Sequence, residues 1–501
     1  MLALAGCPGG DGGIGETCDQ HSDCDRALQC AAGTCVPRCA RAPDCGDGYT
    51  CDETGICLAA TGQPGDACSS EAECAAGLSC QIDGNTVDST GHLLASCTAQ
   101  SSARPPGSVC ARDSDCRNGT CALGHCTDLC DDTRDCAEGT SCMEIPRVGV
   151  NGALFNGCLP SSGNIVWTIP ITAPTANFLF PVPSAAQSAE LVFSVDDPAQ
   201  KVGAQTLVSP SGQVLYTKPC EVQDATCDPV REFYQNIVRH RPELGQSVLG
   251  FPSTPSVPIE TGAYRVMASS YRLNGTPGSA IPHVTAVVRV DSALLLDLHF
   301  YFLDLDAHPC EAAFGDEKLD AAAAQSKSFF QGDFLGELRS IFVHGGIALG
   351  TIDYTDVLDH HDLDGLDAVD AGSLLQLGAA TTGINVFFVR TLSPVGLQAF
   401  GPNPGPAGIA NTRQSGIIIG VDTLCYRSWS QLARVTAHEL ARYMGLHHNV
   451  ELGTDAQGVN WRDMIDDTDD SPNNLMFYSE LGGTDLSPGQ REILQRSGVL
   501  R

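Results

Sequence analysis

One stretch decides the fold of the C-terminal part of this chain: Leu432-Ala-Arg-Val-Thr-Ala-His438-Glu439-Leu-Ala-Arg442-Tyr-Met-Gly445-Leu-His447-His448-Asn449. Ser428 and Ser430 just before it are residues of the kind that cap a helix. Apolar residues then recur at roughly helical spacing, and Gly445 is a natural C-terminal stop. The stretch therefore predicts one helix followed by a tight turn.

The predicted helix and turn have the spacing of a zinc site. Positions 438 and 442 lie one turn apart on the same helix face, and the turn at Gly445 lets His448 approach them. This spacing resembles the extended motif H-E-x-x-H-x-x-G-x-x-H of the metzincin metalloproteases, which continues to a Met-turn. Asn473-Asn474-Leu475-Met476-Phe477 is the candidate Met-turn.

The resemblance to secreted bacterial metzincins extends over residues 292–501. It includes two strand-like runs ahead of the helix, GINVFFVR and SGIIIG, and a closing helix near Leu486–Leu494. It implies one zinc ion held by His438 and His448, with Glu439 as the catalytic general base and Met476 as the floor of the site. It also implies a peptide or protein ligand in the cleft.

One ligand position departs from the family pattern. Arg442 stands where the motif has its second histidine, and an arginine cannot lose its proton or coordinate a cation. A catalytic zinc usually has three protein ligands, so two remain, and Arg442 can pair with Glu439 instead. Weak or lost peptidase activity is therefore expected.

Two other functions stay open. The first is an active zinc endopeptidase with altered ligation, in which His447 replaces the missing ligand. The second is a purely structural or adhesive surface protein.

Composition places the protein outside the cytosol. The chain of 501 residues has 25 cysteines, of which 21 precede residue 160. Such density indicates an oxidising compartment, so we expect an exported protein of the cell envelope or medium. The net charge of −32 disfavours nucleic acid and anionic membrane surfaces as partners.

The first residues resemble the end of a bacterial lipoprotein signal. Met1-Leu-Ala-Leu-Ala-Gly-Cys7 predicts lipidation at Cys7, and removing that residue leaves an even number of cysteines. Residues 1–15 would then be a signal remnant with a Gly-rich linker, and any membrane attachment would be through the lipid. The alternative is an unusual first segment without such a role.

Residues 16–160 carry an internal repeat. The unit is C-x5-C-x(4 or 5)-C with a fourth cysteine at variable distance, and it occurs five times. Few large apolar residues are present, so ten disulfides are expected to stabilise this part in place of a core. Zinc binding is the alternative, although the C-x2-C pairs of zinc knuckles are missing.

Two further domains complete a multidomain architecture. Residues 161–291 contain short β-rich runs that predict an all-β sandwich, with Cys220 and Cys227 as a local disulfide pair. Residues 292–501 predict an α/β (α+β) domain of the metzincin-like kind.

Two smaller features lie in this last domain. Its two remaining cysteines, Cys310 and Cys425, are expected to join the end of the first strand to the segment before the helix. The acidic run Asp362-Leu-Asp364-Gly-Leu-Asp367 is either a partial calcium loop or a solvated loop.

Overall fold

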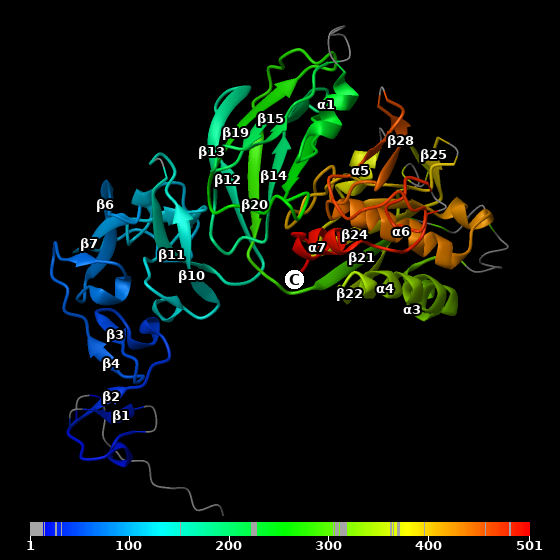
Figure 1. Cartoon of the computed structure of the whole chain (residues 1–501). Helices are drawn as coiled ribbons and strands as arrows, with labels where there is room; N and C mark the ends of the chain where they lie inside the picture. The colour runs from blue at the N-terminus through cyan, green and yellow to red at the C-terminus, as the bar shows by residue number, and fades with distance from the viewer. Residues whose placement is uncertain are drawn as a thin grey trace, which may run out of the picture. The chain divides into compact units, whose positions relative to one another are not determined.

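The computed structural model describes most of the chain as two compact units. Unit 1 contains residues 1–161 with short additions at 181–185 and 261–263, and unit 2 contains the rest. The described residues are 14, 16–25, 28–31, 33–150, 152–221, 228–303, 305, 310, 318–360, 363, 365–367, 371–394, 396–455, 457–479 and 482–501. Cys7, Cys227, Asp362 and Asp364, named above as candidates, lie outside them. The described part is mostly β-sheet with few helices (Figure 1).

Unit 1 confirms the predicted cysteine repeats and their ten disulfides. In every repeat the first cysteine bonds to the third and the second bonds to the fourth, a connectivity that spacing alone does not reveal. The pairs are 18–30 and 24–35, 39–51 and 45–57, 68–80 and 74–97, 110–121 and 116–126, and 130–142 and 136–158.

Each repeat has one short 3-10 turn followed by a hairpin. The turns are η1 (His21–Asp23), η2 (Ala42–Cys45), η3 (Glu71–Glu73), η4 (Asp113–Asp115) and η5 (Thr133–Asp135). The strands are β1 (Leu28–Ala31), β2 (Thr34–Pro37), β3 (Tyr49–Cys51), β4 (Cys57–Ala59), β5 (Ala67–Cys68), β6 (Leu78–Val87), β7 (Leu93–Ala99), β8 (Cys121–Ala122), β9 (His125–Cys126), β10 (Thr140–Pro146) and β11 (Leu154–Pro160).

An acidic residue precedes the second cysteine in every repeat and anchors the turn. Asp23, for example, accepts hydrogen bonds from the backbone N–H groups of Asp19 and Gln20, both at 2.9 Å. Asp44 and Asp115 make the same contacts in their repeats. A carboxylate that accepts from free backbone donors stabilises the start of a helical turn, and the disulfides then provide the buried contacts.

The first part of unit 2 is a sandwich of two sheets. One sheet has the order β12-β20-β14-β18, and the other has the order β13-β19-β15-β16 with β17 beside β15. The strands are β12 (Asn164–Ile169), β13 (Thr175–Val182), β14 (Ser188–Ser194), β15 (Lys201–Val208), β16 (Val214–Thr217), β17 (Glu243–Leu244), β18 (Gln246–Phe251), β19 (Gly262–Tyr271) and β20 (His283–Arg289), with one helix, α1 (Pro229–Gln235).

Aromatic rings join the two sheets of the sandwich. Phe180 of β13 stacks on Trp167 of β12 at 5.7 Å between centroids and meets Phe251 of β18 edge-on at 6.1 Å. Strand β14 pairs antiparallel with both β18 and β20. The alternation of buried and exposed residues in this region therefore corresponds to two sheets that share one core.

The second part of unit 2 contains a five-stranded sheet in the order β22-β21-β24-β27-β26. The first four strands are parallel, and β26 is antiparallel to β27. The strands are β21 (Leu295–Leu303), β22 (Ala348–Val357), β24 (Ile384–Val389), β26 (Ala399–Phe400) and β27 (Ile417–Gly420); two short pairs, β23 (Gly365–Asp367) with β25 (Thr391–Ser393) and β28 (Val450–Thr454) with β29 (Asn460–Arg462), lie outside the sheet.

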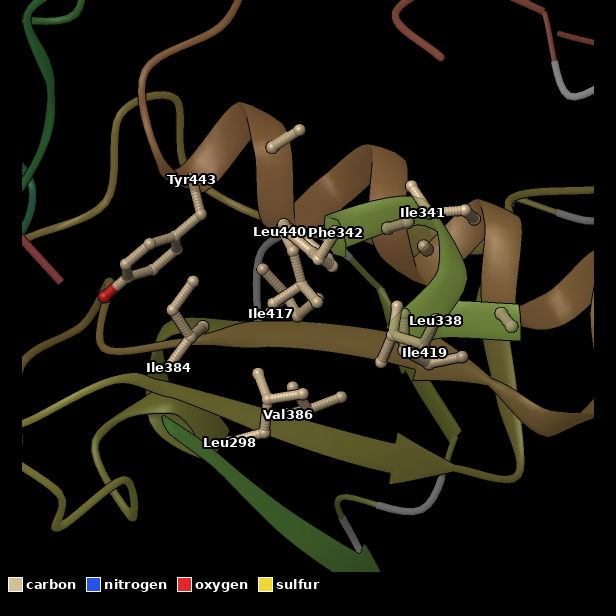
Figure 2. Packing of buried hydrophobic residues seen from close by; sticks show 14 of the residues in the cluster. Leu298, Leu338, Ile341, Phe342, Ile384, Val386, Ile417, Ile419, Leu440 and Tyr443 are labelled. Atoms are coloured by element: carbon tan, nitrogen blue, oxygen red, sulfur yellow. The ribbon is translucent and has the colours of Figure 1, made fainter. Parts of the chain in front are cut away.

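Strands β24 and β27 of this sheet are buried on both faces, which explains their continuous apolar sequences, whereas the edge strand β22 is largely exposed. The helical segments are α3 (Ala321–Ser326), a π-helical turn at Phe329–Phe334, α4 (Leu335–His344), α5 (Ala371–Leu375), the 3-10 segment η8 (Val421–Cys425), α6 (Trp429–Tyr443) and α7 (Pro488–Arg496). Side chains of α4 and α6 pack on one face against Val386, Ile417 and Ile419, as Figure 2 shows. Phe387 and Ile418 point to the other face, against α5.

Buried polar contacts join the sandwich to the second part of unit 2. Glu190 of β14 accepts from the backbone N–H of Ala407 at 2.9 Å, and Arg289 of β20 donates to the carbonyl of Gln495 at 2.6 Å. Both side chains are almost fully buried. The two parts are therefore packed as one body.

Unit 2 also contains disulfide-bonded cysteines. A disulfide joins Cys310 to Cys425 and ties the chain after β21 to η8, the pairing expected from the sequence. Cys220 is also disulfide-bonded, while Cys227 lies outside the described residues.

Among the helices that the structure describes, none combines the length and apolar character that crossing a membrane requires.

Candidate functional site

Helix α6 begins and ends where local sequence requires. The Ser428 side chain accepts from the backbone N–H of Gln431 at 3.2 Å, and the Gln431 side chain accepts from the Ser428 N–H at 2.9 Å. This reciprocal pair is a capping box. At the other end Met444 is the C-cap, and Gly445 follows with φ +103°, which a glycine adopts without strain.

The ring of His438 is held by the segment that contains Met476. Its Nδ1–H donates to the carbonyl of Leu475 at 2.7 Å, so Nε2 keeps its lone pair. Burial lowers the pKa of His438 to about 4. The imidazole is therefore neutral near pH 7.

His448 lies beside His438 and has its own anchor. The two ring centroids are 5.2 Å apart, and the His448 Nδ1–H donates to the Glu451 carboxylate at 2.9 Å. Burial is the largest single effect and tends to raise the pKa of Glu451, but the hydrogen bond and charge of His448, the charge of Arg239 and a hydrogen bond from Tyr234 together lower it. Each histidine is thus oriented by a hydrogen bond from its Nδ1 atom, and neither of these two bonds involves Nε2.

Arg442 is paired with Glu439. The Nη1 atom of Arg442 lies 3.2 Å from each carboxylate oxygen of Glu439. Glu439 is only 7% exposed. The Nε–H of Arg442 is buried and has no hydrogen-bond partner among the described residues. The pair proposed from the sequence is therefore present in the structure, one turn apart on the same helix.

These residues do not fit a catalytic zinc. Among the described residues, only groups of cysteines bring three potential ligand atoms within 4.8 Å of one another. Those cysteines are in disulfides and offer no thiolate. His438 and His448 form no such group with either neighbouring glutamate, and the nearby guanidinium of Arg442 carries a fixed positive charge.

The Met476 segment is fixed from two sides. Met476 is fully buried, and its backbone N–H donates to the Asn474 side chain at 2.8 Å. The Asn474 amide donates in turn to Gln490 of α7 at 2.8 Å, while the Asn449 backbone N–H donates to the Met476 carbonyl at 3.1 Å. The candidate Met-turn therefore lies beneath His438 and is held by α7.

His447 points to a different neighbour from His448. Its Nδ1 lies 3.4 Å from the side-chain nitrogen of Asn403. Burial, together with the charges of Arg239 and Arg442, lowers the pKa of His447 well below its usual value. Among the described residues, His447 belongs to no group of three potential metal ligands, so the geometry does not support His447 as a replacement zinc ligand.

A cleft of about 750 Å³ lies beside the C-terminal end of α6. Arg442, His447 and His448 line it. Part of the lining comes from the sandwich, at Arg239 and Arg241 in the segment that follows α1. Sequence reasoning missed this part of the site, although the run Val238-Arg-His-Arg241 is unusual in a chain with only 28 basic residues.

Comparison with known proteins adds no family to this geometry. No protein-family model matches the chain, and no curated protein shows significant similarity to it. The site is therefore interpreted from its own residues.

Proposed function

We propose that residues 292–501 form a metzincin-like domain that no longer hydrolyses peptides and instead binds a peptide segment of another protein. One observation carries this proposal, the ion pair between Arg442 and Glu439. A general base must accept a proton from the attacking water. Both oxygens of Glu439 already accept from Arg442, and the missing ligand weakens any hold on zinc.

Several features support the relation to metzincins. Helix α6 carries His438 and Glu439, it ends at Gly445, and the chain then turns so that His448 lies beside His438. The segment containing Met476 contacts His438 through the Leu475 carbonyl. Strands β24 and β27 precede the helix, and α7 follows the turn, in the order that the resemblance implies.

An active zinc endopeptidase with altered ligation is the second candidate. The bonds that His438 and His448 make through Nδ1 favour it, because metal-ligating histidines are usually oriented by such bonds. For this candidate a third ligand would have to come from the substrate or from a rearranged side chain.

The setting of the domain is also part of the proposal. Ten disulfides in residues 18–158 require an oxidising environment, so we place the protein outside the cytosol. A lipid on Cys7 would attach it to the cell envelope, with the repeats as a stiff spacer. A purely structural surface role is the alternative if the cleft binds nothing.

An assay of peptide cleavage by the full-length chain tests the proposal. We would incubate the protein with a peptide library, with added zinc and with a chelator, beside the variants Arg442→His and Glu439→Gln. We expect no metal-dependent cleavage by the natural chain. Chelator-sensitive cleavage that Glu439→Gln abolishes would contradict the proposal and support an active zinc endopeptidase instead.

A further inference from the structure

Four arginines gather in the cleft of a strongly acidic protein. Arg239 and Arg241 come from the sandwich, while Arg413 and Arg442 come from the second part of unit 2. The whole chain has 28 basic against 60 acidic residues, yet the cleft lining has four arginines against two glutamates, Glu243 and Glu451. Because Arg442 is paired with Glu439, three arginines remain against these two glutamates. The cleft is thus a local region of positive potential, and such regions attract anions.

Arg239 is the most buried of the four arginines that line the cleft. It is 2% exposed, and its guanidinium stacks over the Tyr234 ring at 4.8 Å. One nitrogen donates to the Arg462 carbonyl, but Nε and Nη1 have no hydrogen-bond partner among the described residues. Because a buried charge is weakly screened, its field reaches into the cleft.

Arg241 and Arg413 are positioned to contact a ligand directly. Neither forms an ion pair with any residue that the structure describes. Arg241 is exposed, and its guanidinium lies 4.2 Å from the centre of the Phe233 ring. Arg413 is half-buried and lies over Gly372. A guanidinium that lines a cleft and has no carboxylate partner among the described residues is well suited to bind a ligand carboxylate.

The rest of the lining favours a peptide over a small inorganic anion. Phe233, Tyr234 and Phe400 give apolar wall, and Asn403 and Gln414 give amide groups. A cleft of about 750 Å³ is large enough for a ligand of several residues. Glu243 and Glu451 offer oxygens to peptide N–H groups.

We propose that the cleft binds an acidic peptide segment, whose side-chain carboxylates contact Arg241 and Arg413. This inference rests on the peptide-binding function proposed above and adds the chemical class of the ligand. It also explains why the cleft arginines come from two separate parts of the chain, residues 239–241 and 413–442, since the segment would lie across both.

Binding of labelled peptides to the full-length chain tests the inference. The probes are a fluorescein-labelled glutamate-rich peptide of about six residues and the matched peptide with glutamine in place of each glutamate. The variants are Arg241→Gln and Arg413→Gln, and the control is Arg265→Gln, which removes an exposed arginine of β19 on the same sandwich. Circular dichroism would show that each variant is folded.

We expect the acidic peptide to bind about tenfold or more tightly than its amide match, and each cleft variant to weaken it about tenfold. Rising salt should weaken it as well, and Arg265→Gln should change little. Equal binding of both peptides, insensitive to the variants, would overturn the inference but leave peptide binding intact. Binding of neither peptide would overturn the inference, while the cleavage assay described above still tests the proposed loss of hydrolysis separately.

Discussion

Arg442 stands where the metzincin motif that this sequence resembles has a histidine, and in the structure it pairs with Glu439. The guanidinium neutralises Glu439, the residue that a peptidase of this kind would need as a base. Meanwhile His438 and His448 keep orienting bonds through Nδ1. The two histidines thus lie next to each other, with the ion pair of Arg442 and Glu439 on the same helix as His438.

The ion pair should contribute measurably to stability. Glu439→Gln leaves Arg442 partly buried without its carboxylate, so we expect the free energy of unfolding to fall by about 1–3 kcal/mol. Urea denaturation measures this change. Glu492→Gln is the matched control, because it breaks another arginine pair whose carboxylate is 45% exposed. The control should change stability by about 0.5 kcal/mol or less, and equal losses in both variants would argue against a special role for the Arg442 pair.

Among the elements, α6 follows from its sequence most directly. Ser428 caps it as expected, whereas Ser430 instead donates to the Asp333 carbonyl at 3.4 Å. The five cysteine repeats can also be predicted from the sequence, but which cysteines form each disulfide cannot. The third and fourth cysteines of a repeat are cross-strand neighbours, such as Cys30 and Cys35, yet each bonds elsewhere. Local spacing is compatible with several pairings, and the fold of the whole repeat selects one.

Gly445 gives a prediction for the end of α6. A Cβ at this position would meet no atom within 4 Å, so Gly445→Ala tests the positive φ alone. We expect a loss of about 1 kcal/mol in the free energy of unfolding. Gly336→Ala in α4 is the control, since its surroundings are equally open and its conformation is helical. That variant should be neutral or stabilising by up to about 1 kcal/mol, and a stabilising Gly445→Ala would contradict the assigned turn.

At the scale of the whole molecule, the cleft could not be predicted. Its arginines lie near residues 240, 413 and 442, and periodicity within one segment gives no information about which segments meet. Within the sandwich alone, the sequence shows no group of residues that predicts a binding or catalytic site. Only its packing against the second part of unit 2, through contacts such as Glu190 with Ala407, brings Arg239 and Arg241 into the same cleft as Arg442.

Glu190 makes this packing sensitive to pH. Burial raises the pKa of Glu190 to about 7 from an ordinary value of 4.5. Between these values the native state binds more protons than the unfolded state, so the contribution of Glu190 to stability falls as pH rises from about 4.5 to about 7. Glu190→Gln removes this titration and can still accept from Ala407.

The variant should match the natural chain at pH 5 and exceed it at pH 8 by about 3 kcal/mol. Urea denaturation at the two pH values measures the difference. A constant offset between the two proteins at both pH values would contradict the assignment.

The central proposal, that Arg442 prevents a metzincin-like site from holding zinc, is tested most directly by zinc content. The full-length chain and Arg442→His would be incubated with zinc, desalted and analysed by elemental mass spectrometry. We predict negligible zinc in the natural chain and about one zinc per chain in Arg442→His, where three histidine ligands are restored. About one zinc per chain in the natural protein would contradict the account.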